Sequence, residues 1–300
     1  MTNFKWFAAI AIAASTIHSL PAESHCPGNV ASLPFHIVNG QQIVLPVSIN
    51  DSGPYNFLLD TGAQITTIDP TLAAQLHLAT GGAATIAGTG FHESASVAPV
   101  NLIEVGTHTV AGFKVLVFNL GNIHSGVVGI LGEDFLDKFD VLIDNDHKQL
   151  CLDGTGTMRT HVKGEHSELL PTNEPANGLS LPAPLVVASR FSDGKRPVRL
   201  ALDSGANVPL LYSPSAFLAV GTIASTAFAV GGSNGGKQSY FALPPQNVRI
   251  GGATLSGVTF LSAASGQGDS HPTEFDGLLP TGLFRRVFID HQEHYAVLEP

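Results

Sequence analysis

Apolar residues in this chain fall in short runs that Gly, Pro, Asn and Asp interrupt. Two runs, 54–59 and 197–202, are typical of strands, and each ends at an aspartate followed by a hydroxyl residue and Gly. Short helices are predicted at 69–76 and 213–218, where Asp or Ser stands before Pro and can cap the first turn. Because the other segments are short, β-branched or broken by Gly, the pattern predicts a mainly β protein.

The two aspartate-ending runs belong to an internal repeat. The sequence Asp-Thr-Gly-Ala at 60–63 returns as Asp-Ser-Gly-Ala at 203–206, which is 143 residues later. Similar spacing relates the two predicted helices, the turns at 105–106 and 250–251, the Gly-containing runs 129–132 and 277–280, and the apolar runs 141–144 and 287–290. A duplication of this kind predicts two similar lobes in one chain.

Residues 1–22 are predicted to be a signal peptide. Lys5 precedes an apolar run at 6–14, and Ala22 or a neighbour suits cleavage. The run is shorter than the roughly 20 apolar residues that a spanning helix needs. An uncleaved N-terminal anchor is the alternative. The signal peptide predicts a secreted or periplasmic protein without stable membrane insertion after cleavage.

The rest of the chain is predicted to hold two lobes and a connection. The N-terminal lobe covers 27–165 and the C-terminal lobe covers 184–300. Between them, 166–183 is predicted to be a linker because it is polar and rich in Pro and has little hydrophobic periodicity.

An Asp-Ser-Gly or Asp-Thr-Gly triplet alone is weak evidence for chemistry. The chain contains a third triplet at Asp51, which lies between two predicted strands and is typical of a turn. Asp60 and Asp203 differ because each follows an apolar strand, where an unpaired carboxylate is costly to bury. Turn aspartates that bond their own backbone are the structural alternative, but two such sites with matched flanks favour chemistry.

Two similar lobes related by an approximate twofold axis bring equivalent residues together at that axis. Asp60 and Asp203 are therefore expected to meet and to share a proton, since two adjacent carboxylates do not both ionise easily. One carboxylate can then act as a base toward water while the other acts as an acid. The following hydroxyls are expected to brace the pair, and the glycines to permit close backbone approach. These supporting residues are Thr61, Gly62, Ala63, Ser204, Gly205 and Ala206.

The motifs at 60–63 and 203–206 resemble those of retropepsin-like aspartic peptidases, here duplicated in one chain as in pepsin-like enzymes. The runs 129–132 and 275–279 resemble the family's hydrophobic-Gly element, although Pro280 replaces the Gly found at 132. The resemblance implies an all-β fold of two β-barrel-like lobes with an active-site cleft between them. It also implies an aspartic endopeptidase that activates water through Asp60 and Asp203. The alternative function is an inactive peptide- or protein-binding protein of the same fold.

Two Gly-containing segments are candidates for flaps that close over a substrate, with ordinary hairpin loops as the alternative. The candidate flap residues are Gly88, Thr89, Gly90, Gly231, Gly232 and Ser233.

Composition excludes several other classes of protein. The net charge is −10 with only 14 Lys and Arg, and no basic cluster suggests a nucleic-acid surface. The 13 histidines are scattered without ligand spacing, so neither a metal nor another cofactor is expected. Because both half-sites lie in one chain, we expect a monomer that acts on a peptide or protein substrate.

The chain has two cysteines, Cys26 and Cys151. In an oxidising compartment they can form a disulfide between the mature N-terminus and the end of the first half. Two free thiols are the alternative.

Overall fold

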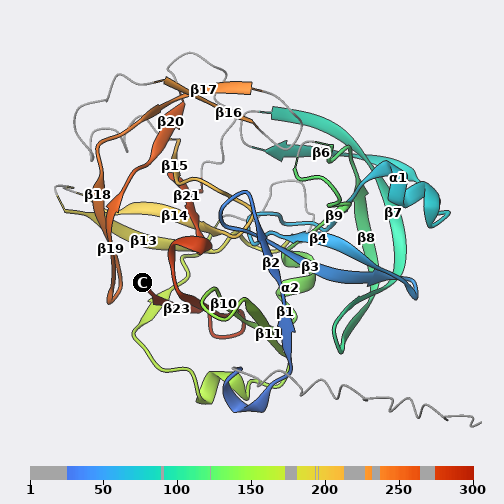
Figure 1. The fold of residues 1–300 in the computed structure, drawn as a ribbon, viewed down its shortest axis with the longest axis horizontal. Helices are drawn as coiled ribbons and strands as arrows, with labels where there is room; N and C mark the ends of the chain where they lie inside the picture. Colours follow the sequence, from blue (N-terminus) through green and yellow to red (C-terminus); the bar gives the residue numbers. More distant parts are fainter. Residues whose placement is uncertain are drawn as a thin grey trace, which may run out of the picture.

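The computed structural model describes residues 26–88, 91–121, 123–172, 181–192, 194, 196–212, 227–231, 237–263 and 274–300. The predicted signal peptide (1–22) and the predicted second helix (213–218) lie outside these residues. Most of the described chain forms strands, which make three sheets. Figure 1 shows one sheet on each side of the molecule and a third that lies below and between them.

The first sheet belongs to the N-terminal half and contains the motif at 60–63. Its strands are, in spatial order, β2 (His36–Val38), β3 (Gln42–Ile49), β4 (Ser52–Leu59), β9 (Gly129–Leu131), β5 (Thr67–Ile68), β8 (His108–Val117), β7 (Phe91–Val105) and β6 (Gly81–Gly88). Strands β4 and β9 pair in parallel, with Leu59 opposite Leu131. Asp60 follows β4 directly, and its amide donates to the Leu131 carbonyl at 3.0 Å.

The second sheet repeats this arrangement in the C-terminal half. Its strands are β16 (Ala227–Gly231), β17 (Lys237–Ala242), β20 (Leu261–Ala263), β15 (Leu210–Leu211), β21 (Gly277–Pro280), β14 (Val198–Asp203), β13 (Val186–Phe191), β18 (Gln246–Ile250) and β19 (Ala253–Val258). Strands β14 and β21 pair in parallel, and their last pair is Asp203 opposite Pro280. Pro280 therefore occupies the position beside the second motif without interrupting this pairing.

The third sheet contains strands from both halves. Its order is β1 (Ser32–Pro34), β11 (Gln149–Asp153), β10 (Asp140–Asp144), β22 (Arg286–Asp290), β23 (Tyr295–Glu299) and β12 (His166–Glu168). The antiparallel pair β10–β22 joins the two halves, with Val141 opposite Ile289. Strand β12 lies at the start of the segment predicted as a linker, so these three residues are part of the sheet.

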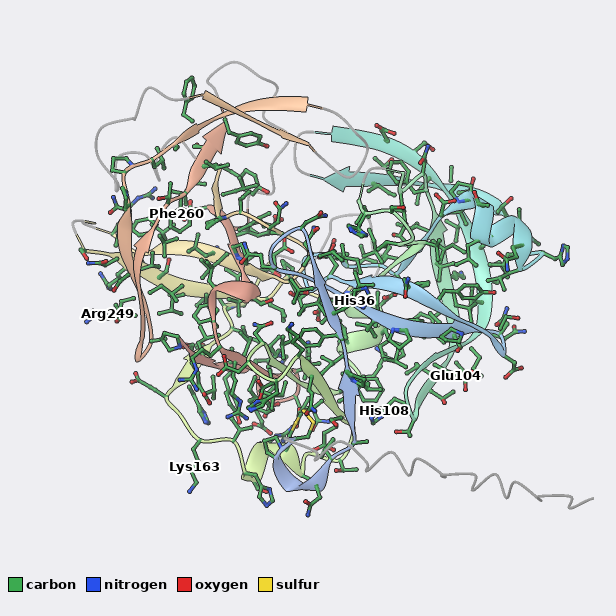
Figure 2. The ribbon with its side chains drawn as sticks, in the orientation of Figure 1. His36, Glu104, His108, Lys163, Arg249 and Phe260 are labelled. Atoms are coloured by element: carbon green, nitrogen blue, oxygen red, sulfur yellow. A yellow bond between two sulfur atoms is a disulfide. The ribbon has the colours of Figure 1, made fainter. Side chains whose placement is uncertain are left out.

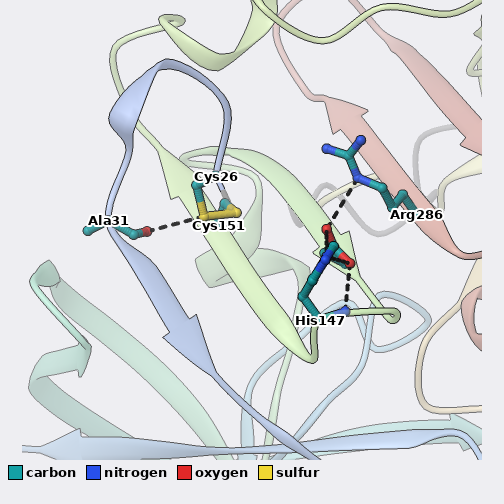
Figure 3. Close-up of a disulfide and its surroundings, with 6 residues drawn as sticks. Cys26, Ala31, His147, Cys151 and Arg286 are labelled. Atoms are coloured by element: carbon teal, nitrogen blue, oxygen red, sulfur yellow. Dashed lines mark hydrogen bonds and ion pairs between the residues drawn. A yellow bond between two sulfur atoms is a disulfide. The ribbon is translucent and has the colours of Figure 1, made fainter. Parts of the chain in front are cut away.

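Ion pairs between buried carboxylates and partly exposed arginines cross the same junction. Arg159 of the first half lies 2.6 Å from Asp290 of the second. Arg286 of the second half, labelled in Figure 3, lies 3.3 Å from Asp144 of the first. Removing one partner of such a pair leaves a buried charge uncompensated, which is strongly destabilising. The two halves are thus joined by strand pairing and by charge.

Helices are few and short in the described part of the chain. They are η1 (Pro27–Asn29), α1 (Pro70–Gln75), α2 (Glu133–Leu136), η2 (Met158–Thr160) and η3 (Thr281–Leu283). The first predicted helix is α1, and Asp69 caps it by accepting a hydrogen bond from the Thr71 amide at 2.8 Å. No helix among the described residues is long and apolar enough to cross a membrane.

One large cluster of buried apolar side chains extends through both halves. Figure 2 labels Phe260, a fully buried member of this cluster in the second half. The structure also joins Cys26 and Cys151 in a disulfide, with their Cα atoms 5.8 Å apart (Figure 3). The bond ties the segment before β1 to β11 of the third sheet.

Candidate active site

The two repeated aspartates lie at equivalent places in the two halves. Asp60 stands at the end of β4 and Asp203 is the last residue of β14. The leucines just before them, Leu59 and Leu202, are fully buried. Each strand thus carries its aspartate out of the core of its own lobe into a turn that faces the other lobe.

Reciprocal hydrogen bonds lock these two turns together. The Thr61 amide donates to the Ser204 hydroxyl oxygen at 3.0 Å, and the Ser204 amide donates to the Thr61 hydroxyl oxygen at 3.0 Å. Each hydroxyl in turn donates across the interface, Thr61 to the Leu202 carbonyl at 3.0 Å and Ser204 to the Leu59 carbonyl at 2.8 Å. Both side chains are buried, so these four bonds satisfy polar groups that water does not reach.

The glycine of each turn contacts the carboxyl group of the opposite turn. A Cβ atom on Gly62 would lie 2.6 Å from the Asp203 carboxyl carbon, and one on Gly205 would lie 2.3 Å from the Asp60 carboxyl carbon. Neither position leaves room for any side chain. The two glycines therefore allow the carboxyl groups to meet between the turns.

Backbone donors hold both carboxylates, but unequally. The Gly62 amide donates to Asp60 Oδ1 at 2.9 Å. In the second turn, the amides of Gly205 and Ala206 both donate to Asp203 Oδ1, each at 2.8 Å. The Ala63 amide divides its hydrogen bond between the main-chain carbonyl of Asp60, at 3.2 Å, and the Asp60 carboxyl group. Asp203 is thus the better supported carboxylate.

Burial and mutual repulsion raise the affinity of this pair for protons. Burial raises the pKa of Asp60 well above its ordinary value, and the neighbouring Asp203 charge raises it further. Burial also raises the pKa of Asp203, while hydrogen bonds from Ala206, Asp60 and Gly205 oppose this shift. The arrangement favours a pair that holds one proton between its two members.

The segment after β9 supports the first turn from below. The Glu133 amide donates to the Ala63 carbonyl at 2.8 Å, and a Cβ atom on Gly132 would lie 2.7 Å from that same oxygen. Asp134 accepts bonds from the Thr66 amide and hydroxyl at 2.9 and 2.6 Å. This segment continues directly from the run at 129–132, which resembles the hydrophobic-Gly element in sequence.

Both candidate flap segments form antiparallel hairpins. Gly88 ends β6 opposite Phe91 of β7, and Gly231 ends β16 opposite Lys237 of β17. The tips of the two hairpins, which include Thr89, Gly90, Gly232 and Ser233, lie outside the described residues. Figure 1 shows the two hairpins at the top of the molecule, on the same side of it.

Two glutamines contact the second turn, and the sequence analysis missed them. Gln41 and Gln42 lie at the turn of the β2–β3 hairpin and donate to the carbonyls of Asn207 and Gly205. Polar residues in a hairpin turn are common, so their types and spacing gave no signal. Elsewhere, the described residues hold no cluster of three or more His, Cys, Asp or Glu that could bind a metal ion.

Comparisons with known proteins bear on the fold and on the first half of the chain. Residues 45–135 match the family model described as aspartyl protease. The crystal structure of an aspartic proteinase from Irpex lacteus, 14% identical in sequence, superposes with a TM-score of 0.55 over 90% of this chain and 97% of that one. The chain has the two-lobed aspartic proteinase fold. The fold class and the resemblance predicted from the sequence are thereby confirmed.

A retropepsin-like aspartic protease from Rickettsia conorii is 20% identical in sequence. The match covers 41% of this chain and 90% of that one, with a TM-score of 0.32. No curated protein sequence matches the chain. The family model supports aspartic peptidase activity in general, and it includes the first aspartate turn of this aspartic proteinase fold.

The hydroxyl bonds between the turns predict the effect of a single substitution. Thr61→Val keeps the shape of the side chain but leaves the buried Ser204 amide without its acceptor. We expect the free energy of unfolding to fall by about 1–3 kcal/mol in urea denaturation. The control is Thr80→Val at an exposed position, where we expect a change of less than about 0.5 kcal/mol. Equal stability of the two variants would show that the bonds between the turns do not stabilise the fold.

Proposed function

We propose that this protein is an aspartic endopeptidase whose Asp60–Asp203 pair activates a water molecule. The observation that carries the proposal is the close meeting of two carboxyl groups, with Asp203 buried and Asp60 partly buried, each against the glycine of the opposite turn. A buried pair of like charges is costly unless it shares a proton, and a singly protonated pair supplies an acid and a base at one place.

The chemistry follows from one proton shared between two carboxyl groups. The ionised carboxylate accepts a proton from water as the water oxygen attacks the carbonyl carbon of the peptide. The protonated carboxyl group gives its proton to the carbonyl oxygen, which yields a neutral tetrahedral diol. The carboxyl group that received the water proton then protonates the amide nitrogen while the other takes back a proton from the diol. The C–N bond breaks, and the pair returns to its singly protonated state.

The backbone around the pair suits an extended peptide as substrate. The aspartates lie between two β lobes, and the hairpins β6–β7 and β16–β17 are placed on one side of the molecule. An extended peptide can pair with exposed strand edges of this kind through its main chain. An inactive binding protein of the same fold would not require both carboxyl groups, both hydroxyls and both glycines to be kept.

We propose in the same way that the mature protein acts outside the cytoplasm as a monomer. The support for an oxidising compartment is the Cys26–Cys151 disulfide together with the signal-like sequence at 1–22. The support for a monomer is that both aspartate turns come from one chain.

Removal of either carboxylate is the direct test of the proposed function. Asp60→Asn and Asp203→Asn should each reduce peptide cleavage to less than about a hundredth of the wild-type rate, because a general acid or base contributes about 10²–10⁴-fold. Cleavage of a diverse peptide library is measured by mass spectrometry. The control is Asp51→Asn in the third triplet, which is exposed and has a φ of 60°. The Asp51→Asn variant should cleave normally. Cleavage at more than about a hundredth of the wild-type rate in either Asp60→Asn or Asp203→Asn would refute the dyad.

The residues after the two glycines predict the pH range of activity. Neither Ala63 nor Ala206 offers a hydroxyl donor to the carboxylates, and a donor to the charged form lowers a carboxyl pKa. We therefore expect an optimum in mildly acidic conditions. Ala63→Ser and Ala206→Ser should move the acidic limb of the kcat/KM profile to lower pH. An acidic limb that stays in place in both variants would show that the missing hydroxyls do not set the optimum.

A further inference from the structure

The hairpin of β2 and β3 reaches from the N-terminal half to the second aspartate turn. Its turn residues project two carboxamides toward the main chain that follows Asp203. Gln42 Nε2 donates to the Gly205 carbonyl, and Gln41 Nε2 donates to the Asn207 carbonyl at 2.5 Å. Figures 1 and 2 show this hairpin, which carries the labelled His36, between the two halves.

The Gln42 bond acts on the same peptide group that holds the carboxylate. The Gly205 carbonyl and the Ala206 amide belong to one planar peptide unit, and they point in opposite directions. Gln42 binds the carbonyl end, while the amide end donates to Asp203 Oδ1 at 2.8 Å. A donor at the carbonyl fixes the plane and polarises the N–H group, because hydrogen bonds in a chain strengthen one another.

The carboxamide of Gln42 is itself held in place. Asn39 Nδ2 donates to Gln42 Oε1 at 2.8 Å and to the Ile123 carbonyl at 3.0 Å. The Asn39 bond leaves the amide end of Gln42 directed at Gly205. The orientation of this side chain is therefore set by the first half of the protein.

Gln41 fixes the hairpin against a second part of the C-terminal half. A Cβ atom on Gly282 would lie 2.5 Å from the Cβ of Gln41, so the hairpin turn packs directly on η3. Helix η3 follows β21, whose Pro280 is the strand partner of Asp203. The hairpin thus lies against both segments that flank the second aspartate.

The first turn is held in a different way. Its glutamine, Gln64, donates outward to the Pro182 carbonyl at 2.8 Å. The Ala206 amide donates to the Asp203 carboxylate at 2.8 Å, whereas the equivalent Ala63 amide divides its bond between the main-chain carbonyl of Asp60, at 3.2 Å, and the Asp60 carboxyl group. The contact between the hairpin and the turn is therefore one source of the inequality between the two carboxylates.

We propose that Gln42 is a positioning residue that orients the Gly205–Ala206 peptide and thereby makes Asp203 the ionised base and Asp60 the protonated acid. The proposal deepens the proposed peptidase function and rests on it for the roles of base and acid. Among the described residues, Asp60 is the charged group that faces Asp203. The hairpin carries one titratable side chain, the exposed His36, while β21 and η3 carry none.

The test compares two variants. Gln42→Met keeps the length of the side chain but removes the Nε2 donor, and Gln75→Met at the exposed end of α1 is the matched control. The Asp203 carboxyl carbon is followed by ¹³C NMR in the full-length protein, and its signal is assigned by its loss in Asp203→Asn. In Gln42→Met the Asp203 titration and the acidic limb of kcat/KM should both move up by about 0.5 pH unit or more, since a lost donor disfavours the charged form. In Gln75→Met both should match the wild type.

A second variant keeps the proposal falsifiable. If Gln42→Met does not fold, Gln42→Glu keeps the side-chain length and the bond from Asn39, and should shift the Asp203 titration in the same direction. An Asp203 titration unchanged in the folded Gln42 variants would overturn the proposal. A shifted titration in a protein that cleaves no peptide would support the link from Gln42 to Asp203 and refute only the peptidase function.

Discussion

The reciprocal bonds between Thr61 and Ser204 are the interaction on which the site depends. They join two turns that are 143 residues apart and place their carboxyl groups within contact of each other. Each turn alone would be an ordinary strand end with an exposed aspartate. Because the hydroxyls also bond the carbonyls of Leu59 and Leu202, the turns cannot separate without leaving several buried polar groups unpaired.

The rest of the fold holds the two turns against the repulsion between their carboxylates. The third sheet pairs β10 with β22 across the halves, and ion pairs cross the same junction. A further contact links His291 of the second half to Glu133 at 2.9 Å, while the Glu133 amide holds the carbonyl of Ala63. These contacts make the spacing of the aspartates a property of the whole molecule and not of either lobe.

The repeated parts of this structure could be predicted from the sequence. The matched triplets, the capped helix at 70–75 and the strands before the aspartates all follow from local patterns that occur twice or have clear end signals. The third sheet could not be predicted in this way, because β10 and β22 are far apart in the chain and neither strand indicates its partner. Strand β12 was missed because its three residues lie in a polar segment with no periodicity of its own.

The contacts that make the two aspartates unequal were also beyond the sequence. Gln41 and Gln42 are typical hairpin residues, and their role depends on where a loop of one half meets the main chain of the other. The same holds for the pairing of Cys26 with Cys151, which the sequence permits but does not decide. The contacts across the junction of the two halves are therefore the features that the structure reveals and that the sequence could not predict.

The central claim is that the fold forces two carboxyl groups into one buried, proton-sharing pair. It is tested most directly by the free energy of unfolding of the wild type and of Asp203→Asn as a function of pH. A carboxyl group whose pKa is raised by folding stabilises the protein fully below its unfolded pKa, and this contribution is lost as the pH rises through the folded pKa. From about pH 4, the ordinary pKa of an aspartate, to about pH 7, the wild type should therefore lose stability relative to the variant. Two stability curves that run parallel across this range would contradict the account.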